Sequence, residues 1–318
     1  SPYVAALAMD GDEMGKWVSG EKTPELLHQL SKNAKRHLEA ILKGKGKTKI
    51  KRLLTPSYHL QLSETLANFS TWLAEPIVQA FDGQLIYAGG DDVLAMLPSD
   101  RAIECAKTLR AIFRGESPET EIRNLPLNVV QTGFVSAGAG YPLMVPGPEA
   151  DVSVGIAIGH NKAPLQMLVR EAQNAEKLAK GRYGRGAVAV SVYKHSGEII
   201  HWGSKWDGAG LKLMEFMQQH ANREKDSGKE APISGRFPYA LAGLLEPYTL
   251  MDSLPAMHEV IITEFKHVVG QQGAGLDKEK KQALEQLGQQ WLEQTKKHLE
   301  DFIKLFLVET FINRHQGE

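Results

Sequence analysis

The segment that decides the fold of this chain is QLIYAGGDDVLAML, residues 84–97. Two apolar runs, 85–88 and 93–97, flank the Gly-Gly-Asp-Asp sequence at 89–92. Because glycine adopts positive φ without steric cost, this pattern predicts a β-hairpin with a tight turn. Gly-Gly-Asp-Asp alone is also ordinary turn chemistry, so a functional interpretation depends on what other segments bring to the turn.

A second acidic turn lies near the start of the chain. Residues 3–9, YVAALAM, form a continuous apolar run typical of a central strand covered on both faces, and Asp-Gly-Asp follows at 10–12. If the two strands are antiparallel neighbours, both turns meet at one edge of the sheet. Carboxylates so close together repel, and their pKa values rise unless a cation is bound. Mg²⁺ and Mn²⁺ prefer oxygen ligands, and a pair of such ions suits phosphoryl transfer. The predicted metal ligands are Asp10, Asp12, Asp91 and Asp92.

The segments around these turns predict an α+β domain. Helical periodicity or strand-like runs mark the helices 24–42, 56–80, 100–113 and 164–180 and the strands 152–158 and 186–193. The resulting order is β-α-α-β-β-α-β-α-β. Residues 117–149 are rich in glycine and proline and predict a loop with one short strand.

Beyond about residue 200 the strand signal disappears. Four segments favour helix instead, at 209–220, 236–246, 254–269 and 277–314. A chain of 318 residues is long enough for two domains. We therefore expect an α+β domain at 1–200, with a helical and basic insertion at about 20–56, and an all-α bundle at 201–318.

The composition limits the classes of function. A net charge of -1 excludes a globally basic, histone-like binder. A single cysteine excludes an internal disulfide framework and a zinc site built on several cysteines, and it fits a reducing, cytoplasmic compartment. No apolar run approaches the roughly 18 residues of a membrane helix, so no membrane partner is expected. A core strand that opens at residue 3 indicates a segment of a larger protein.

A local basic cluster lies at KGKGKTKIKR, residues 43–52, in which six of ten residues are basic and none is acidic. Two interpretations of this cluster stay open with equal weight. One is a solvated loop, and the other is a contact with phosphate groups or an RNA backbone.

The chain resembles the palm domain of the nucleotide-cyclase and polymerase superfamily, which includes the GGDEF diguanylate cyclases. Four motifs carry the resemblance: AMDGDEMGKW (8–17), LIYAGGDDVLAML (85–97), VSVGIAIGH (152–160) and AKGRYGRGAVAV (179–190). They are most similar to the large polymerase/cyclase subunit of type III CRISPR effector complexes. The resemblance covers residues 3–193 by motif and the rest by architecture, and it implies a ferredoxin-like palm followed by an all-α helical bundle.

This resemblance implies an enzyme that makes cyclic oligoadenylates from ATP. The 3′-hydroxyl of one nucleotide attacks the α-phosphate of the next, pyrophosphate leaves, and two Mg²⁺ or Mn²⁺ ions serve as cofactors. By motif, Asp10, Asp91 and Asp92 are the catalytic, metal-binding acids, and Asp12 is a ligand or an orienting residue. The expected nucleotide contacts are Gly89, Gly90, Ser57, Lys180 and Arg182.

Some of these contacts have a structural alternative. The C-terminus of a helix also favours a lysine at position 180 electrostatically. The start of a helix at Ser57 attracts anions, but serine is equally suited to cap the helix, and Thr55 and Ser63 compete for that role.

The sequence departs from the related families in two respects. Diguanylate cyclases usually end this hairpin in Glu-Phe, where the chain reads Asp91-Asp92-Val93, so a cyclic-di-GMP enzyme is not expected. The HD nuclease, first palm and zinc module that normally precede the final palm are absent from this sequence, although two palms normally form the nucleotide pocket together.

The implied partners are the other subunits of the complex, guide RNA and target RNA. The main alternative is a non-catalytic scaffold that binds RNA and small helical subunits. A template-copying polymerase is the least favoured function.

Overall fold

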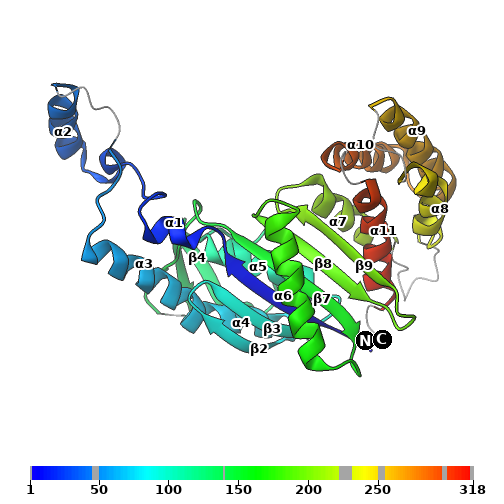
Figure 1. The fold of residues 1–318 in the computed structure, drawn as a ribbon, viewed down its shortest axis with the longest axis horizontal. Coiled ribbons are helices and arrows are strands. Elements are labelled where there is room, and N and C mark those ends of the chain that lie inside the picture. Colours follow the sequence, from blue (N-terminus) through cyan, green and yellow to red (C-terminus); the bar gives the residue numbers. More distant parts are fainter. Residues whose placement is uncertain are drawn as a thin grey trace.

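A six-stranded sheet forms the centre of the structure (Figure 1). The computed structural model describes residues 2–44, 50–138, 140–221, 231–249, 255–295 and 299–315. The strand order is β2-β3-β1-β7-β8-β9, with β7 and β8 parallel and the other neighbouring pairs antiparallel. The strands are β1 (Tyr3–Gly11), β2 (Gln84–Gly89), β3 (Asp92–Pro98), β7 (Val152–His160), β8 (Ala187–Tyr193) and β9 (Ile199–Lys205).

The three continuous apolar segments form β1, β7 and β8 in the middle of the sheet, where both faces are covered. The expected hairpin is formed by β2 and β3, and helix α6 (Leu165–Gly181) connects the parallel pair β7 and β8. The α+β palm fold followed by a helical region is therefore confirmed.

Helix α6 covers one face of this sheet (Figure 1). The contact is built from small side chains, including Ala8 of β1 and Ala172 of α6. At Gly155 of β7 the helix touches the strand backbone, because a Cβ atom there would lie 2.0 Å from the backbone nitrogen of Glu176. Gly155 therefore sets how closely the second half of α6 approaches the sheet.

The opposite face of the sheet carries the larger core. The segment predicted as one helix at 56–80 forms α3 (Pro56–Asn68), the π-helical turn η2 (Phe69–Leu73) and α4 (Ala74–Ala80) in succession. Together with α5 (Ala102–Phe113), these elements bury aromatic and aliphatic side chains against the strands. Phe69 and Phe113, for example, meet edge to face with ring centroids 5.0 Å apart.

The predicted helix 24–42 is wrong in its first half. Glu25 is extended and pairs with Lys51, a 3₁₀ turn η1 (Leu26–Gln29) follows, and the helix α2 begins only at Lys32 and ends at Gly44. In Figure 1, α2 stands away from the sheet. After Met14–Val18, a short helix α1, the chain leaves the sheet and returns at α3. Residues 45–49 of the basic cluster lie outside the described residues.

The expectation of one short strand within 117–149 is also wrong. This region forms a separate three-stranded sheet of β4 (Leu127–Gln131), β5 (Phe134–Ala137) and β6 (Leu143–Met144). The strands are two to five residues long and mostly half-exposed, so they carry little hydrophobic periodicity that sequence could reveal.

The absence of strands after residue 200 is contradicted by β9, which pairs with β8 along its whole length. Its sequence, IIHWGSK, has no clean alternation, although Ile200, Trp202, Gly203 and Ser204 are buried. The helices that follow are α7 (Ala209–Ala221), α8 (Phe237–Thr249), α9 (Pro255–Gln272), α10 (Lys278–Gln294) and α11 (Leu299–Arg314).

The segment predicted as one helix at 277–314 is thus two helices, α10 and α11, because α10 is capped at Thr295. The core runs without interruption from the sheet into this helical region. Trp202 of β9 and Trp291 of α10, for example, have ring centroids 6.2 Å apart. Within the described residues, no helix combines the length and apolar character needed to cross a membrane.

Candidate active site

The end of β1 and the β2–β3 turn meet at one edge of the sheet. The antiparallel register of β1 and β3, continued by one residue, sets Asp10 opposite Asp92. The carboxylate of Asp91 lies against the next residue of β1, because a Cβ atom on Gly11 would be 2.6 Å from Oδ2 of Asp91. The fold therefore brings the two acidic turns together.

Two side chains of α6 face these acids. Alternate residues of β1 and β3 point toward α6, and Asp10 and Asp92 continue those rows. Lys180 forms one ion pair with Asp10 and a second with Glu176, one helical turn earlier, at 2.7 Å between Nζ and Oε1. We call Asp10, Asp91, Asp92 and Glu176 the carboxylate cluster.

The carboxylate cluster is costly to ionise without a cation. Burial raises the pKa of Asp91, and the neighbouring charge of Asp92 raises it further. Burial also raises the pKa of Asp92. Burial and the negative charges of Asp12 and Asp92 raise the pKa of Glu176 to about 6. These shifts indicate that the surrounding cations do not fully neutralise the carboxylates when all of them are ionised.

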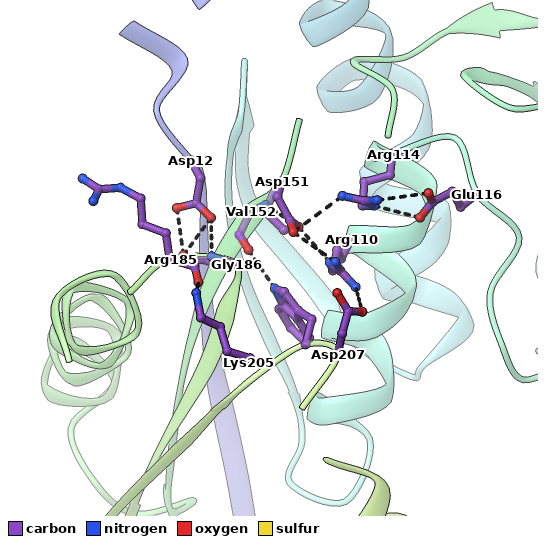
Figure 2. Close-up of polar contacts among 12 residues, drawn as sticks. Asp12, Arg110, Arg114, Glu116, Asp151, Val152, Arg185, Gly186, Lys205 and Asp207 are labelled. Atoms are coloured by element: carbon purple, nitrogen blue, oxygen red, sulfur yellow. Dashed lines mark hydrogen bonds and ion pairs between the residues drawn. The ribbon is translucent and has the colours of Figure 1, made fainter. Parts of the chain in front are cut away.

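Asp12 has a different environment from Asp10, although it lies only two residues further along the chain. It is 4% exposed and accepts hydrogen bonds from Oγ of Ser153, at 2.8 and 3.0 Å, and from the backbone N–H of Gly186, at 2.7 Å. Figure 2 shows this carboxylate pointing at the turn before β8. Burial raises its pKa against these donors. Asp12 thus fastens β1 to β7 and β8, which suits the orienting role better than the ligand role.

A second charged cluster lies beside Asp12 on the other face of the sheet (Figure 2). Arg110 donates two hydrogen bonds to Asp151, from Nε at 2.7 Å and from Nη2 at 3.0 Å. Arg114 lies 3.5 Å from the same carboxylate and donates to Glu116 at 2.7 Å, while Arg110 also reaches Asp207 at 3.4 Å. We call these five residues the arginine cluster.

The predicted phosphate contacts fall into two groups. Gly90 has a φ of 65° and open space on its side-chain side, and Gly89 precedes it at the end of β2. Lys180 also lies at the carboxylate cluster. Arg182, in contrast, donates to two acids at the start of α11, Glu300 and Asp301, at 2.9 and 2.8 Å.

Ser57 does not cap α3. The cap is Thr55, whose side-chain oxygen accepts from the backbone N–H of Tyr58, and the Ser57 hydroxyl bonds to that of Thr55 at 2.9 Å. A nucleotide contact at Ser57 stays a prediction.

A pocket of about 170 Å³ lies between α1, α3 and the loop after β6. Its lining is mostly apolar and includes Met14, Trp17, Tyr58 and Leu62. Met14 connects the pocket to the acids, because its Cγ atom and Oδ2 of Asp91 both lie within 3 Å of the Cβ position at Gly11. A flat aromatic group bound here would hold its attached phosphates toward the carboxylate cluster.

The donor chemistry of the site fits hard divalent cations. Its ligand atoms are carboxylate oxygens with raised pKa values, which is the set that Mg²⁺ and Mn²⁺ prefer. Among the residues that the structure describes, no three acidic, histidine or cysteine side chains converge closely enough to enclose a metal ion. Among the described residues, Lys180 forms ion pairs with two of these acids, and the positive charges of Lys177 and Arg185 also act on Glu176.

Sequence reasoning missed Glu176. Its signal was available, because it stands four residues before Lys180, on the same side of a predicted helix. The apolar stripe of that helix dominates its pattern, and a single glutamate beside such a stripe has the same pattern as a solvated one.

Comparisons with known proteins bear on this site. The family profile "Cas10/Cmr2, second palm domain" matches residues 3–189. The chain is 35% identical over 238 residues to "CRISPR system Cmr subunit Cmr2" of Pyrococcus furiosus, a match that covers 74% of this chain and 23% of the relative. The chain thus spans less than a quarter of that relative's length.

Solved structures share the fold over nearly the whole chain. A type III-B Cmr-beta complex bound to cognate target RNA matches with a TM-score of 0.62 at 15% identity, covering 98% of this chain and 39% of the matched chain. A Csm1–Csm4 cassette in complex with cA4 matches with a TM-score of 0.53 at 14% identity, covering 98% and 36%. Both matches include the helical region as well as the palm.

Proposed function

The chain belongs to the Cas10/Cmr2 family through its second palm domain, and from this premise we propose that it synthesises cyclic oligoadenylates from ATP. The observation that carries the proposal is the meeting of Asp10, Asp91 and Asp92 at one sheet edge, beside Lys180 of α6. A fold-level relative bound to cA4 supports the class of product.

The proposed reaction is nucleotidyl transfer. The 3′-oxygen of one nucleotide forms a bond to the α-phosphorus of the next, the bond to the β-phosphate oxygen breaks, and the hydroxyl proton goes to solvent as pyrophosphate leaves. Asp10, Asp91 and Asp92 would hold two divalent ions, which when bound activate the attacking hydroxyl and neutralise the leaving group. Lys180 adds a positive charge for the triphosphate.

The surrounding backbone would position the nucleotide. The open space at Gly90 lets phosphate oxygens approach the turn, and the pocket beside Met14 accepts the base. Asp12 holds the end of β1 in place through hydrogen bonds from Ser153 and Gly186. The carboxylate of Asp10, two residues earlier, therefore keeps its orientation toward the site.

The proposed setting is a type III CRISPR effector complex that contains guide RNA and is activated by target RNA. A match to such a complex with its target RNA supports this setting. The basic segment 43–52 is the first place to look for an RNA contact.

The decisive assay incubates the full effector complex with ATP, Mn²⁺ or Mg²⁺ and target RNA, and detects cyclic products by mass spectrometry. We expect Asp91→Ala/Asp92→Ala to lower the rate by at least about a thousandfold, as loss of transition-state charge stabilisation does. The fold should survive, because carboxylates in a turn contribute little packing. Glu64→Ala/Glu75→Ala, which removes two exposed acids from α3 and α4, is the matched control and should stay active.

Two results would count against the proposal. An inactive wild-type complex would remove the enzymatic function, and an active double variant would move the site elsewhere. Calorimetry with ATP then separates the enzyme from a scaffold, because a scaffold should bind no nucleotide in a metal-dependent way.

A further inference from the structure

Lys180 is a cation that contacts two members of the carboxylate cluster. Its ammonium group contacts Asp10 on β1 and Glu176 on α6, so it joins the sheet edge to the helix above it. The Lys180 side chain is 22% exposed, against 34% for Asp10 and 13% for Glu176. Part of the Lys180 side chain therefore faces solvent while its ammonium group contacts both acids.

An ammonium group and a divalent ion compete for the same oxygens. Two cations that share the carboxylate of Asp10 would repel one another, so a bound divalent ion weakens the contact between Asp10 and Lys180. The helix itself has little freedom to move, because Gly155 holds its backbone directly on β7. Only the head of the Lys180 side chain, on its flexible four-carbon stem, can make room.

The end of α6 also offers the displaced ammonium a destination. Lys180 lies in the last turn of α6, at the same sheet edge as the Gly90 turn, where phosphate oxygens have open access. Its neighbour Lys177 is exposed on the same helix and makes neither of these contacts. Lys177 thus carries the same charge on the same helix without an ion pair to the carboxylate cluster, although its charge lowers the pKa of Glu176.

We infer that Lys180 is an internal counter-ion that holds the carboxylate cluster in the metal-free chain, and that metal entry releases it to the triphosphate of ATP. This inference rests on the proposed function. It makes Lys180 and metal ions competitors when no nucleotide is bound, and it makes metal and ATP cooperative when both are present. By linkage, each should strengthen the binding of the other.

The test uses the large subunit as its gene encodes it, purified without RNA. Free Mn²⁺ is measured by electron paramagnetic resonance, first without nucleotide and then with a non-reactive ATP analogue that carries an α,β-methylene bridge. Asp91→Asn/Asp92→Asn defines the background, and only the Mn²⁺ that this variant fails to bind is assigned to the site. Lys177→Gln is the matched control for the loss of one positive charge on α6.

Without nucleotide, Lys180→Gln should bind Mn²⁺ about tenfold more tightly than wild type, within the usual range of coupling between sites. With Mn²⁺ present, it should bind the ATP analogue about tenfold more weakly, because the released ammonium is missing. Lys177→Gln should change either affinity by less than about twofold, as expected for a screened surface charge. The melting temperatures of Lys180→Gln and of a second variant, Lys180→Met, are compared with that of wild type. A large drop would show that a change in affinity reflects loss of the fold.

Two outcomes overturn the inference. If Lys180→Gln binds Mn²⁺ no more tightly than wild type, Lys180 is not a competitor of the metal, although the proposed function still stands. If wild type binds no more Mn²⁺ than Asp91→Asn/Asp92→Asn, the metal site is absent and the proposed function falls as well.

Discussion

The carboxylate cluster lies on the α6 side of the sheet and the arginine cluster on the α5 side, and their charges are balanced in opposite ways. Asp151 receives a bidentate pair from Arg110 and a further contact from Arg114, and both arginines are anchored on α5. In the carboxylate cluster, the ion pairs of Asp10 and Glu176 share one lysine.

The choice of arginine or lysine as the partner of the acids suits the two clusters to different roles. Arginine is not deprotonated in a protein, and its planar fork matches a carboxylate, so Asp151 keeps charged partners at any ordinary pH. A lysine head on a flexible stem is an exchangeable partner. Arg110 and Arg114 thus hold Asp151 in place, whereas the proposed site depends on a lysine that another cation can replace.

The largest expected effect comes from moving α6. Gly155→Val places side-chain atoms where the backbone of Glu176 lies, so the helix must lift from the sheet. We expect a loss of at least about 3 kcal/mol in the free energy of unfolding, the upper range for overpacking, together with loss of activity. Urea denaturation measures the first and product formation the second. Gly181→Ala, with open space around its Cβ position, is the control and should unfold like wild type.

The next effect compares the two clusters directly. Asp151→Asn should lower the free energy of unfolding by about 2 kcal/mol, because it weakens charge-assisted hydrogen bonds to Arg110. Asp91→Asn should leave stability unchanged or raise it without metal, because it removes a repelling charge. Denaturation of both variants in the presence of a chelator checks this, and losses of equal size would erase the contrast between the clusters.

A pH-dependent effect concerns Glu309 in α11, which is fully buried. Burial raises the pKa of its carboxyl from 4.5 to about 8. The folded chain therefore holds a proton that the unfolded chain releases above pH 4.5, so stability should fall as the pH rises from 4.5 to about 8. Glu309→Gln should lose this dependence, so its advantage over wild type should grow between pH 5 and 8. Parallel stability profiles of the two chains would contradict the assignment.

The fold was predictable from sequence where burial is extreme. The apolar segments of β1, β7 and β8 and the GGDD hairpin identified the palm, because strands covered on both faces leave a continuous signal. Strand β9 was not predicted because its His-Trp-Gly-Ser run lacks hydrophobic alternation. Its burial depends on helices that lie far along the chain.

Of the site, the sequence predicted the acids that lie within the two turns. Asp10 and Asp92 follow from strand pairing alone. The separate roles of Asp10 and Asp12 do not, since Asp-Gly-Asp gives no sign that Ser153 and Gly186 bind only the second acid. The hydrogen bonds of Arg182, a predicted phosphate contact, were not predictable either, because their acceptors lie on α11, more than a hundred residues away.

The uninterrupted core between the sheet and the helical region has a consequence for calorimetry. Trp202 of β9 contacts Trp291, and β9 itself lies across the domain boundary predicted at residue 200, so neither half of the chain can lose its structure without exposing apolar surface of the other. The two halves should therefore melt in a single cooperative heat-absorption peak. A scanning calorimeter that resolved two separate peaks would show that the sheet and the helices unfold independently.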